Sequence, residues 1–309
     1  MVSLGIIALL VALLLPAIQS SREAARKVAC ASHLRQVAMG MHSHEGLQRH
    51  LPTGGWGWRW TGEPDRGFGA EQPGGWVFNV LPFLEQDELR KAGSWIGNPD
   101  RASILSASAS VPVSVFNCPS RRAGTTLAFV HPVDYVNMSR PQLVARGDYA
   151  ACSGDLAPDV SGGRGRGPVS LPEGDSPWYV WHELDRSGIV YRRSTVSLGA
   201  ISDGTTNTYL VGEKYLAQND YYSGKAENDD QHHFVGYDSD TLRTTDLSYP
   251  PLWDGFNVTS DHSFGSAHPT GFNMAMADGS VAFISYAVNL EVHRTRGNRF
   301  DRGVVQANP

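Results

Sequence analysis

Two segments of the sequence gather side chains that could bind a metal ion. The first segment, 227–233, packs carboxylates and imidazoles into seven residues, and its candidate ligands are Asp229, Asp230, His232 and His233. Both groups are common ligands of divalent cations. A solvated loop can have the same composition, and we expect the loop here rather than the metal site.

The second segment combines His268 with Asp278-Gly279, which follow after nine intervening residues. An imidazole and a carboxylate could share a metal ion. However, Asp-Gly lies between two apolar runs, 272–277 and 280–285, and this pattern predicts a β-hairpin with a type I′ turn. We therefore expect Asp278 to start the turn and His268 to hydrogen-bond a neighbouring loop.

No catalytic motif is recognisable. His44-Glu45 and His182-Glu183 begin strings of the HExxH kind, but neither continues to the second histidine that would bind zinc. GxSxG is absent, and Asp238-Ser239-Asp240 lacks the further ligands and the glycine of an EF-hand loop. Since no nucleophile, base and oxyanion donors can be assembled, we expect a protein that is not an enzyme.

Three alternating tryptophans, Trp56, Trp58 and Trp60, follow the period of one face of a strand. Such rings could stack on sugars, or they could cover the sheet and the base of a helix. We expect the covering role. Stacking on sugars would support an alternative function, a membrane-tethered module that binds glycans or other ligands.

The first element of the scaffold is a long N-terminal helix. Residues 2–18 are almost entirely apolar and no charge precedes Arg22, so we predict a membrane span over about residues 2–19. A cleaved signal peptide would need a basic region and a turn-like cleavage site, which the segment lacks. A buried core helix also fits an apolar run, but a helix that is apolar all round fits a membrane better.

The helix should then become amphipathic. Cys30, Leu34, Val37 and Met41 are spaced by four, three and four residues and share one stripe. We predict a continuous helix to about His44, kinked at Pro16, with this stripe packed against a sheet. The helical segment then occupies residues 1–45.

Residues 46–309 are predicted to form one α+β domain with long loops. The chain has 33 glycines and 18 prolines, which indicates many turns. Strands are expected within 147–155, 189–200, 209–213 and the hairpin, and a short helix near Pro82. The predicted fold is α+β, with a long N-terminal pilin-like helix packed on an antiparallel β-sheet. The net charge of −5 argues against a nucleic-acid partner.

The N-terminal segment 5–44 resembles the helix of type IV pilins and type II secretion pseudopilins. More closely, the chain resembles the DUF1559 family, which combines a prepilin-like N-terminus with a domain of unknown function. The stretches FNCPS (116–120), ISDGTTNTYLVGEKY (201–215) and 264–283 agree with it. The last stretch contains His268, Asp278 and Gly279, which match the family's H-X9-DG motif. The resemblance covers nearly the whole chain.

This resemblance implies a membrane-anchored, pseudopilin-like structural or assembly protein of the bacterial cell envelope. It would cross the inner membrane once, with its C-terminal domain outside the cytoplasm. Its partners would be the membrane, copies of itself or other pseudopilins, and a secretion or pilus assembly machinery. No cofactor is expected, except that Ca²⁺ is implied by analogy with related pseudopilins.

The family's proteins begin with a short basic leader and a G-F-T-L-x-E stretch, which a prepilin peptidase cuts. Neither is present in this sequence, and we expect codons upstream of Met1 to encode them. Arg22, Arg26 and Lys27 follow the predicted span and would favour a cytoplasmic domain. A basic leader would offset that bias.

The resemblance also bears on the three cysteines. Cys30 and Cys118 lie in segments similar to the family's own cysteine positions, whereas Cys152 does not. Cys30 is on the inward stripe of the helix, and Cys118 ends an apolar run before Pro119. We predict a Cys30–Cys118 disulfide that would stabilise the fold by about 4 kcal/mol, with Cys152 free. Two separate buried thiols are the alternative.

Overall fold

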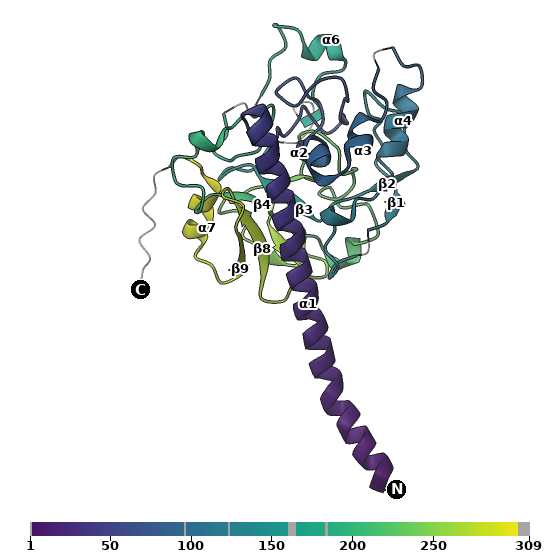
Figure 1. The fold of residues 1–309 in the computed structure, drawn as a ribbon, viewed down its shortest axis with the longest axis vertical. Coiled ribbons are helices and arrows are strands. Elements are labelled where there is room, and N and C mark those ends of the chain that lie inside the picture. Colours follow the sequence, from purple (N-terminus) through teal and green to yellow (C-terminus); the bar gives the residue numbers. More distant parts are fainter. Residues whose placement is uncertain (1, 96, 123, 160–164, 183–184, 302–309) are drawn as a thin grey trace.

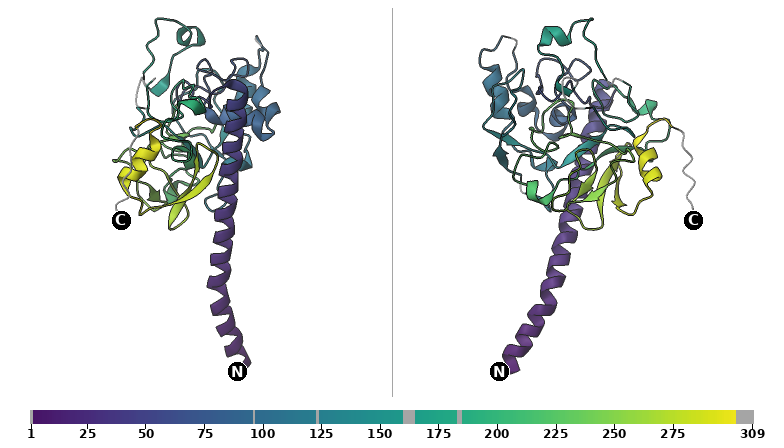
Figure 2. Two further views of the ribbon diagram at one scale, coloured as in Figure 1. Left: turned by 60° about the vertical axis from the view of Figure 1, so that its left-hand side comes forward. Right: turned by 180° about the vertical axis from the view of Figure 1, so that it is seen from behind.

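The computed structural model describes residues 2–95, 97–122, 124–159, 165–182 and 185–301; for residues 2–11 and 13 it describes the backbone alone. One helix, α1 (Val2–Gln48), dominates the shape. Its first half projects from the rest of the chain, and its second half lies along it (Figures 1 and 2). We call residues 2–22 the projecting half, residues 23–48 the docked half, and the described residues from 49 onwards the head.

The predicted helix is therefore confirmed, and it runs through Pro16 without interruption. Among the described residues, no helix has both the length and the hydropathy of a membrane-spanning segment. Most side chains of the membrane span predicted over about residues 2–19 lie outside the described part of the structure.

The head is built on a five-stranded sheet with the order β5-β3-β4-β8-β9. Its neighbouring strands are antiparallel except for the short parallel pair β3–β5. Two small two-stranded sheets, β1-β2 and β6-β7, lie beside it. The strands are β1 (Thr126–Ala128), β2 (Leu143–Ala145), β3 (Tyr149–Cys152), β4 (Tyr209–Glu213), β5 (Leu242–Arg243), β6 (Leu252–Trp253), β7 (Gly265–Ser266), β8 (Gly271–Met276) and β9 (Val281–Ser285).

The helices after α1 are short and lie around this sheet (Figure 1). They are α2 (Trp76–Val80), η1 (Leu81–Leu84), α3 (Asp87–Lys91), α4 (Arg101–Ser108), η2 (Ser114–Phe116), α6 (Leu171–Gly174), η3 (Leu198–Ala200), η4 (Gln218–Asp220) and α7 (Leu290–Gly297). The long N-terminal helix, the sheet and the loops between these elements confirm the predicted α+β fold.

Both faces of the sheet are buried. The docked half of α1 covers one face, where the predicted stripe of Cys30, Leu34, Val37 and Met41 is completely buried in the main core with Ala275 of β8. On the opposite face, Phe272, Met274 and Met276 of β8 join a second core with Tyr209 and Phe264. The alternation along β8 thus follows the two-residue period of a strand.

The β8–β9 hairpin is confirmed, but the predicted turn type is wrong. Backbone bonds link Met276 N to Ser280 O at 2.8 Å and Gly279 N to Met276 O at 2.9 Å, so three residues form the connection. Within this connection only Gly279 has a positive φ, of 85°. A type I′ turn needs two such residues, whereas a three-residue loop needs a single left-handed residue at its end.

Replacing Gly279 by valine should destabilise the protein by about 1–2 kcal/mol, because a β-branched residue is strained at positive φ. Space is not the obstacle, since the nearest atom to an added Cβ is His42 Nε2 at 3.5 Å. Gly279→Asn is the matched control, because asparagine tolerates this conformation. Thermal unfolding of the two variants measures the difference, and equal midpoints would contradict the turn geometry.

Two predicted strands are not present. The segment 56–60 has no strand, and its indole groups bind distant carbonyls instead: Trp56 Nε1 donates to Ala70 O and Trp60 Nε1 to Pro168 O, both at 2.9 Å. The segment 189–200 forms turns and η3. The short helix expected near Pro82 is the 3-10 helix η1, which α2 precedes and α3 follows. Strands β3 and β4 lie where they were predicted.

Candidate metal centre

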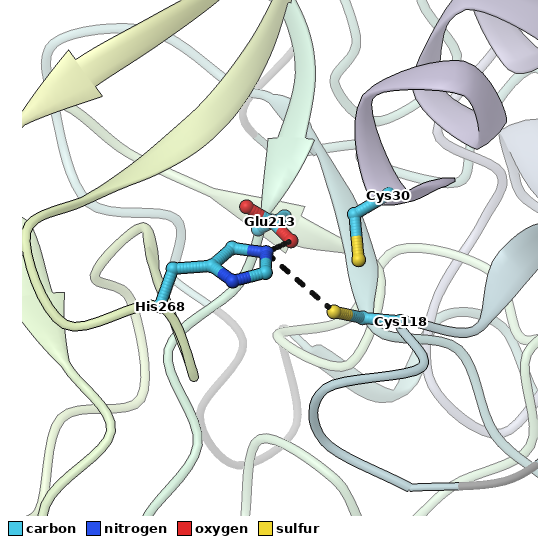
Figure 3. Close-up of side chains that lie close together, drawn as sticks. All are labelled: Cys30, Cys118, Glu213 and His268. Carbon is cyan, nitrogen blue, oxygen red and sulfur yellow. Dashed lines mark hydrogen bonds and ion pairs between the residues drawn. The ribbon is translucent and has the colours of Figure 1, made fainter. Parts of the chain in front are cut away.

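Four side chains that could ligate a metal meet between α1 and the sheet. Cys30 comes from the docked half of α1, Cys118 from the loop after η2, Glu213 from the end of β4, and His268 from the loop before β8 (Figure 3). Their ligand atoms all lie within 4.8 Å of one another. All four side chains are buried, with at most 1% of any of them exposed. We call these four residues the cysteine–histidine cluster.

His268 is held from both ring nitrogens. Nδ1 lies 2.6 Å from Oε1 of Glu23, a residue of α1 two turns before Cys30. Nε2 points into the cluster, 3.2 Å from Glu213 Oε1 and 3.9 Å from Cys118 Sγ. The imidazole therefore has its orientation set by a carboxylate on one side and faces the ligand atoms on the other.

Glu213 is fixed through one of its two oxygens. Oε2 accepts hydrogen bonds from the backbone N of Asn273 at 2.6 Å and from Asn273 Nδ2 at 3.1 Å. Oε1 points toward His268 and pairs with its Nε2 at 3.2 Å. Glu213 is therefore anchored to β8 by one oxygen and faces the cluster with the other.

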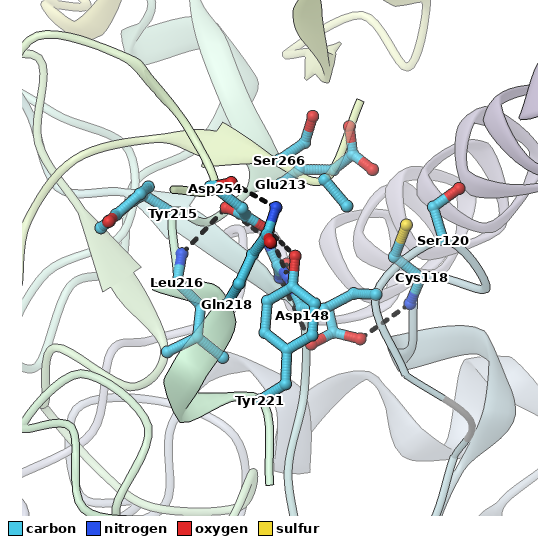
Figure 4. Close-up of polar contacts among 12 residues, drawn as sticks. Cys118, Ser120, Asp148, Glu213, Tyr215, Leu216, Gln218, Tyr221, Asp254 and Ser266 are labelled. Carbon is cyan, nitrogen blue, oxygen red and sulfur yellow. Dashed lines mark hydrogen bonds and ion pairs between the residues drawn. The ribbon is translucent and has the colours of Figure 1, made fainter. Parts of the chain in front are cut away.

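The loop that carries Cys118 is held by buried charges. Asp148 Oδ2 accepts a hydrogen bond from the backbone N of Cys118 at 2.8 Å (Figure 4). Asp148 Oδ1 also lies 3.3 Å from Arg121 Nη1 and 3.0 Å from Arg122 Nη2. Arg121 also forms an ion pair with Asp254, and its Nε lies 2.9 Å from Asp254 Oδ2. Since these four charged side chains are buried, they position the loop rigidly.

Contacts within the cluster shift the pKa values of its members. The Cys30 thiol, burial and the Glu213 carboxylate hold the pKa of Cys118 well above its ordinary value. Burial lowers the pKa of His268, but hydrogen bonds to Cys118 and Glu213 outweigh it and raise this pKa to about 11. Without a metal, the cluster therefore holds a thiol at Cys118 and an imidazolium between two carboxylates.

Glu23, His268 and Cys118 follow the order carboxylate, imidazole, thiol that is found in cysteine nucleophile sites. Two observations argue against such a role. The Cys118 pKa is raised, whereas a reactive thiol needs a lowered one. The thiol is also buried, and a cleft of about 810 Å³ in the head is lined by other residues. The cluster is better suited to a structural task.

The predicted cysteine pair is brought together in one site with His268 and Glu213, and both cysteines are free thiols in this structure. Cys152 is also a free, buried thiol. It lies in the second core, where its Sγ is 3.8 Å from Gly297 O.

The segment 227–233 is not the solvated loop that we expected, because most of its side chains are buried. Asp229 is buried and bridges Arg122 and Lys214, at 2.6 and 2.9 Å. His232 and His233 are buried among aromatic rings, and burial lowers the pKa of both, that of His233 to about 3. Asp230 faces a cleft, where its carboxylate lies 4.0 Å from His131. Distant partners explain this burial, and loop composition did not predict it.

The three tryptophans do not form a stacking platform. Trp56 and Trp60 are completely buried and pack edge to face, with ring centroids 5.1 Å apart. Trp58 is half-buried and lines the cleft of about 810 Å³ together with His131, Asp230 and Asp261. Only Trp58 of the three could therefore reach a ligand.

The H-X9-DG motif is divided between two places. His268 belongs to the cysteine–histidine cluster, whereas Asp278 is exposed in the hairpin turn, where its Oδ1 accepts from Ser280 N at 2.8 Å. Thus Asp278 acts as the predicted turn residue and does not share a metal site with His268. His268 contacts Cys118 of a neighbouring loop, and it also contacts Glu23 of α1 and Glu213 of β4.

Sequence reasoning missed Glu213 and Glu23. Glu213 ends an apolar strand whose residues are all buried, and a carboxylate in such a run is a signal of a buried partner. Glu23 lies seven residues before Cys30 and so continues the same stripe of the helix.

Thiolate sulfur is a soft ligand that Ca²⁺ avoids, so this cluster does not fit the calcium implied by analogy.

One family model matches most of the chain. The family described as "Protein of unknown function (DUF1559)" matches residues 19–291. Neither the curated proteins nor the solved structures contain a match to the chain. The matched range includes all four residues of the cysteine–histidine cluster as well as Glu23.

Proposed function

This chain belongs to the DUF1559 family, and on that premise we propose that it is a membrane-anchored, pseudopilin-like structural subunit of the bacterial cell envelope without catalytic activity. The observation that carries the proposal is the division of α1 into two halves. The docked half is built into the head, while the projecting half extends away from it (Figure 2). A helix of this kind joins a globular head to a layer or filament outside it.

The composition of the projecting half supports an apolar partner. Leu14, Leu15 and Ile18 expose 56%, 55% and 46% of their surface. Residues 14–18 carry no charge, and the first charged residue is Arg22. Exposed apolar side chains gathered on one helix mark a site of membrane or protein contact. We propose that the projecting half lies in the inner membrane and that the head lies outside the cytoplasm.

The docked half supports a mechanical role for the head. Because its inward stripe is completely buried, the helix and the head should move as one body. Copies of the chain could then pack through their projecting helices and present their heads at the surface. The proposed partners are therefore other copies or other pseudopilins, together with a secretion or pilus assembly machinery.

Removing residues 1–20 should release a folded, soluble head, because the side chains described in this segment, those of residues 12 and 14–20, are all exposed. The full chain should remain in the membrane pellet after a carbonate wash, which removes peripheral proteins. Fractionation followed by circular dichroism of the soluble form measures both results. A truncated chain that stays in the pellet, or a full chain that washes off, would contradict the anchor.

Assembly needs a separate measurement. Cross-linking in intact cells should yield oligomers of the full chain through the projecting half, and co-purification should recover a secretion ATPase. A strictly monomeric chain without these partners would leave a membrane anchor but refute the pseudopilin role.

The cleft beside Trp58 favours a second function, a membrane-tethered ligand-binding module. A half-buried indole and the carboxylates of Asp230 and Asp261 line this cleft, and aromatic and carboxylate groups together suit a sugar. Quenching of tryptophan fluorescence by soluble envelope glycans, lost in Trp58→Ala but kept in Trp253→Ala, would support it. Trp253 is a fair control because it is exposed and does not line this cleft.

A further inference from the structure

We propose that Cys30, Cys118, His268 and Glu213 bind one Zn²⁺ ion, which fastens α1 to the head where the helix leaves it. The ligand set is two thiolates, one imidazole and one carboxylate. Zinc accepts all three ligand types, and structural zinc sites have four protein ligands in a closed tetrahedron. This site is independent of the proposed pseudopilin role.

The distances suit a tetrahedral ion. Zinc bonds of about 2.0–2.3 Å place neighbouring ligand atoms roughly 3.3–3.8 Å apart. Two pairs in the cluster are already close to these values, with His268 Nε2 at 3.2 Å from Glu213 Oε1 and at 3.9 Å from Cys118 Sγ. The largest separation within the cluster is bounded by 4.8 Å. Side-chain shifts of about 1 Å would therefore complete the site.

The oxygen of Glu213 that faces the cluster supplies an independent argument. Oε2 is engaged with Asn273, so Oε1 is the oxygen left to face the cluster, where it lies 3.2 Å from His268 Nε2. A disulfide between Cys30 and Cys118 would leave Glu213 Oε1 and His268 Nε2 facing each other without joining them to the sulfurs. A metal ion would bind the oxygen and both sulfurs together.

The groups behind the ligands are those that a metal site requires. Histidine ligands usually donate their second N–H to a carboxylate, and Glu23 takes this place behind His268 at 2.6 Å. Asn273 orients Glu213, and Asp148 holds the backbone of Cys118. Each of these three ligands is thus held before any ion arrives, which favours tight binding.

The position of the cluster explains what the ion would do. Cys30 is the first completely buried residue of α1 after the projecting half, and the other ligands belong to the head. Glu23 is 29% exposed at its side chain and marks the side from which an ion can enter. Since zinc binding contributes to folding free energy, the ion would stabilise the junction between helix and head.

Metal analysis of the full chain, purified in detergent without chelators, tests the proposal. We expect one zinc ion per chain in the wild type, and loss of most of it in Cys30→Ser, Cys118→Ser and Glu213→Gln. Cys152→Ser is the matched control, because Cys152 is equally buried but lies in the second core, and it should retain the zinc.

A measurement on the unaltered chain guards against variants that fail to fold. Removing the metal with a chelator should lower the unfolding midpoint by about 5–10 °C, and Zn²⁺ but not Ca²⁺ should restore it. Co²⁺ in place of zinc should show thiolate charge-transfer absorption. The proposal would be overturned if protein purified without chelators contained no metal and yielded Cys30 and Cys118 as a disulfide-linked peptide. A midpoint that does not respond to Zn²⁺ would also overturn it.

Discussion

Replacing Leu34 by alanine should lower the free energy of unfolding by about 3 kcal/mol. Leu34 lies in the middle of the inward stripe of α1 and is completely buried between the helix and the sheet. The substitution removes its apolar contacts and leaves a cavity that the packed core fills only in part. The variant should therefore weaken the junction of helix and head more than any change at the surface of the helix.

Leu47→Ala in the same helix is the matched control, because Leu47 is 68% exposed. Both substitutions change helix propensity equally, so the difference between them isolates burial. Urea unfolding followed by tryptophan fluorescence measures both variants. Losses of similar size would mean that the docked half is not packed as described.

Replacing Asp229 by asparagine should destabilise the protein by about 3–5 kcal/mol, because it removes a negative charge that two buried cations share. Both oxygens of Asp229 are engaged: Oδ2 lies 2.6 Å from Arg122 Nη1, and Oδ1 lies 2.9 Å from Lys214 Nζ. All three side chains are buried. Asp134→Asn is the control, since Asp134 forms a surface pair with Arg140 and should lose less than about 1 kcal/mol.

The destabilisation caused by Asp229→Asn should depend on pH. Burial raises the pKa of Asp229, but Arg122 and Lys214 outweigh it and hold this pKa below its ordinary value. A carboxylate whose pKa is lowered on folding stabilises the protein above its unfolded pKa of about 4, and this stability is lost as the pH falls further. The gap between wild type and Asp229→Asn should thus be largest near neutral pH and narrow below about pH 4. A gap that widens in acid would contradict the ionic role.

Elements with a regular local pattern were predictable. The spacing of Cys30, Leu34, Val37 and Met41 identified both the helix and the face that it buries, because helical periodicity depends on neighbouring residues alone. The β8–β9 hairpin was predictable for the same reason, since Asp278-Gly279 interrupts two alternating runs. The turn type was not, because the register of the strands decides how many residues the connection contains.

Elements without such a pattern depended on distant partners. The alternation at Trp56 and Trp60 suggested a strand, yet Ala70 and Pro168 accept their indole hydrogen bonds and bury both rings in loops. The charged segment around Asp229 suggested a solvated loop, yet Arg122, 107 residues away, makes its burial possible. A polar residue is buried only where the fold supplies its partner, and composition does not contain that information.

The sequence by itself determined the long helix, its inward face, the hairpin and the family to which the chain belongs. It also singled out Cys30, Cys118 and His268, but not what unites them. Only the tertiary structure placed these residues beside Glu213, because the cluster takes one ligand from each of four segments spread over residues 30–268. Helix docking and strand order bring such segments together, and both arise from burial of the whole core rather than from any local run of residues.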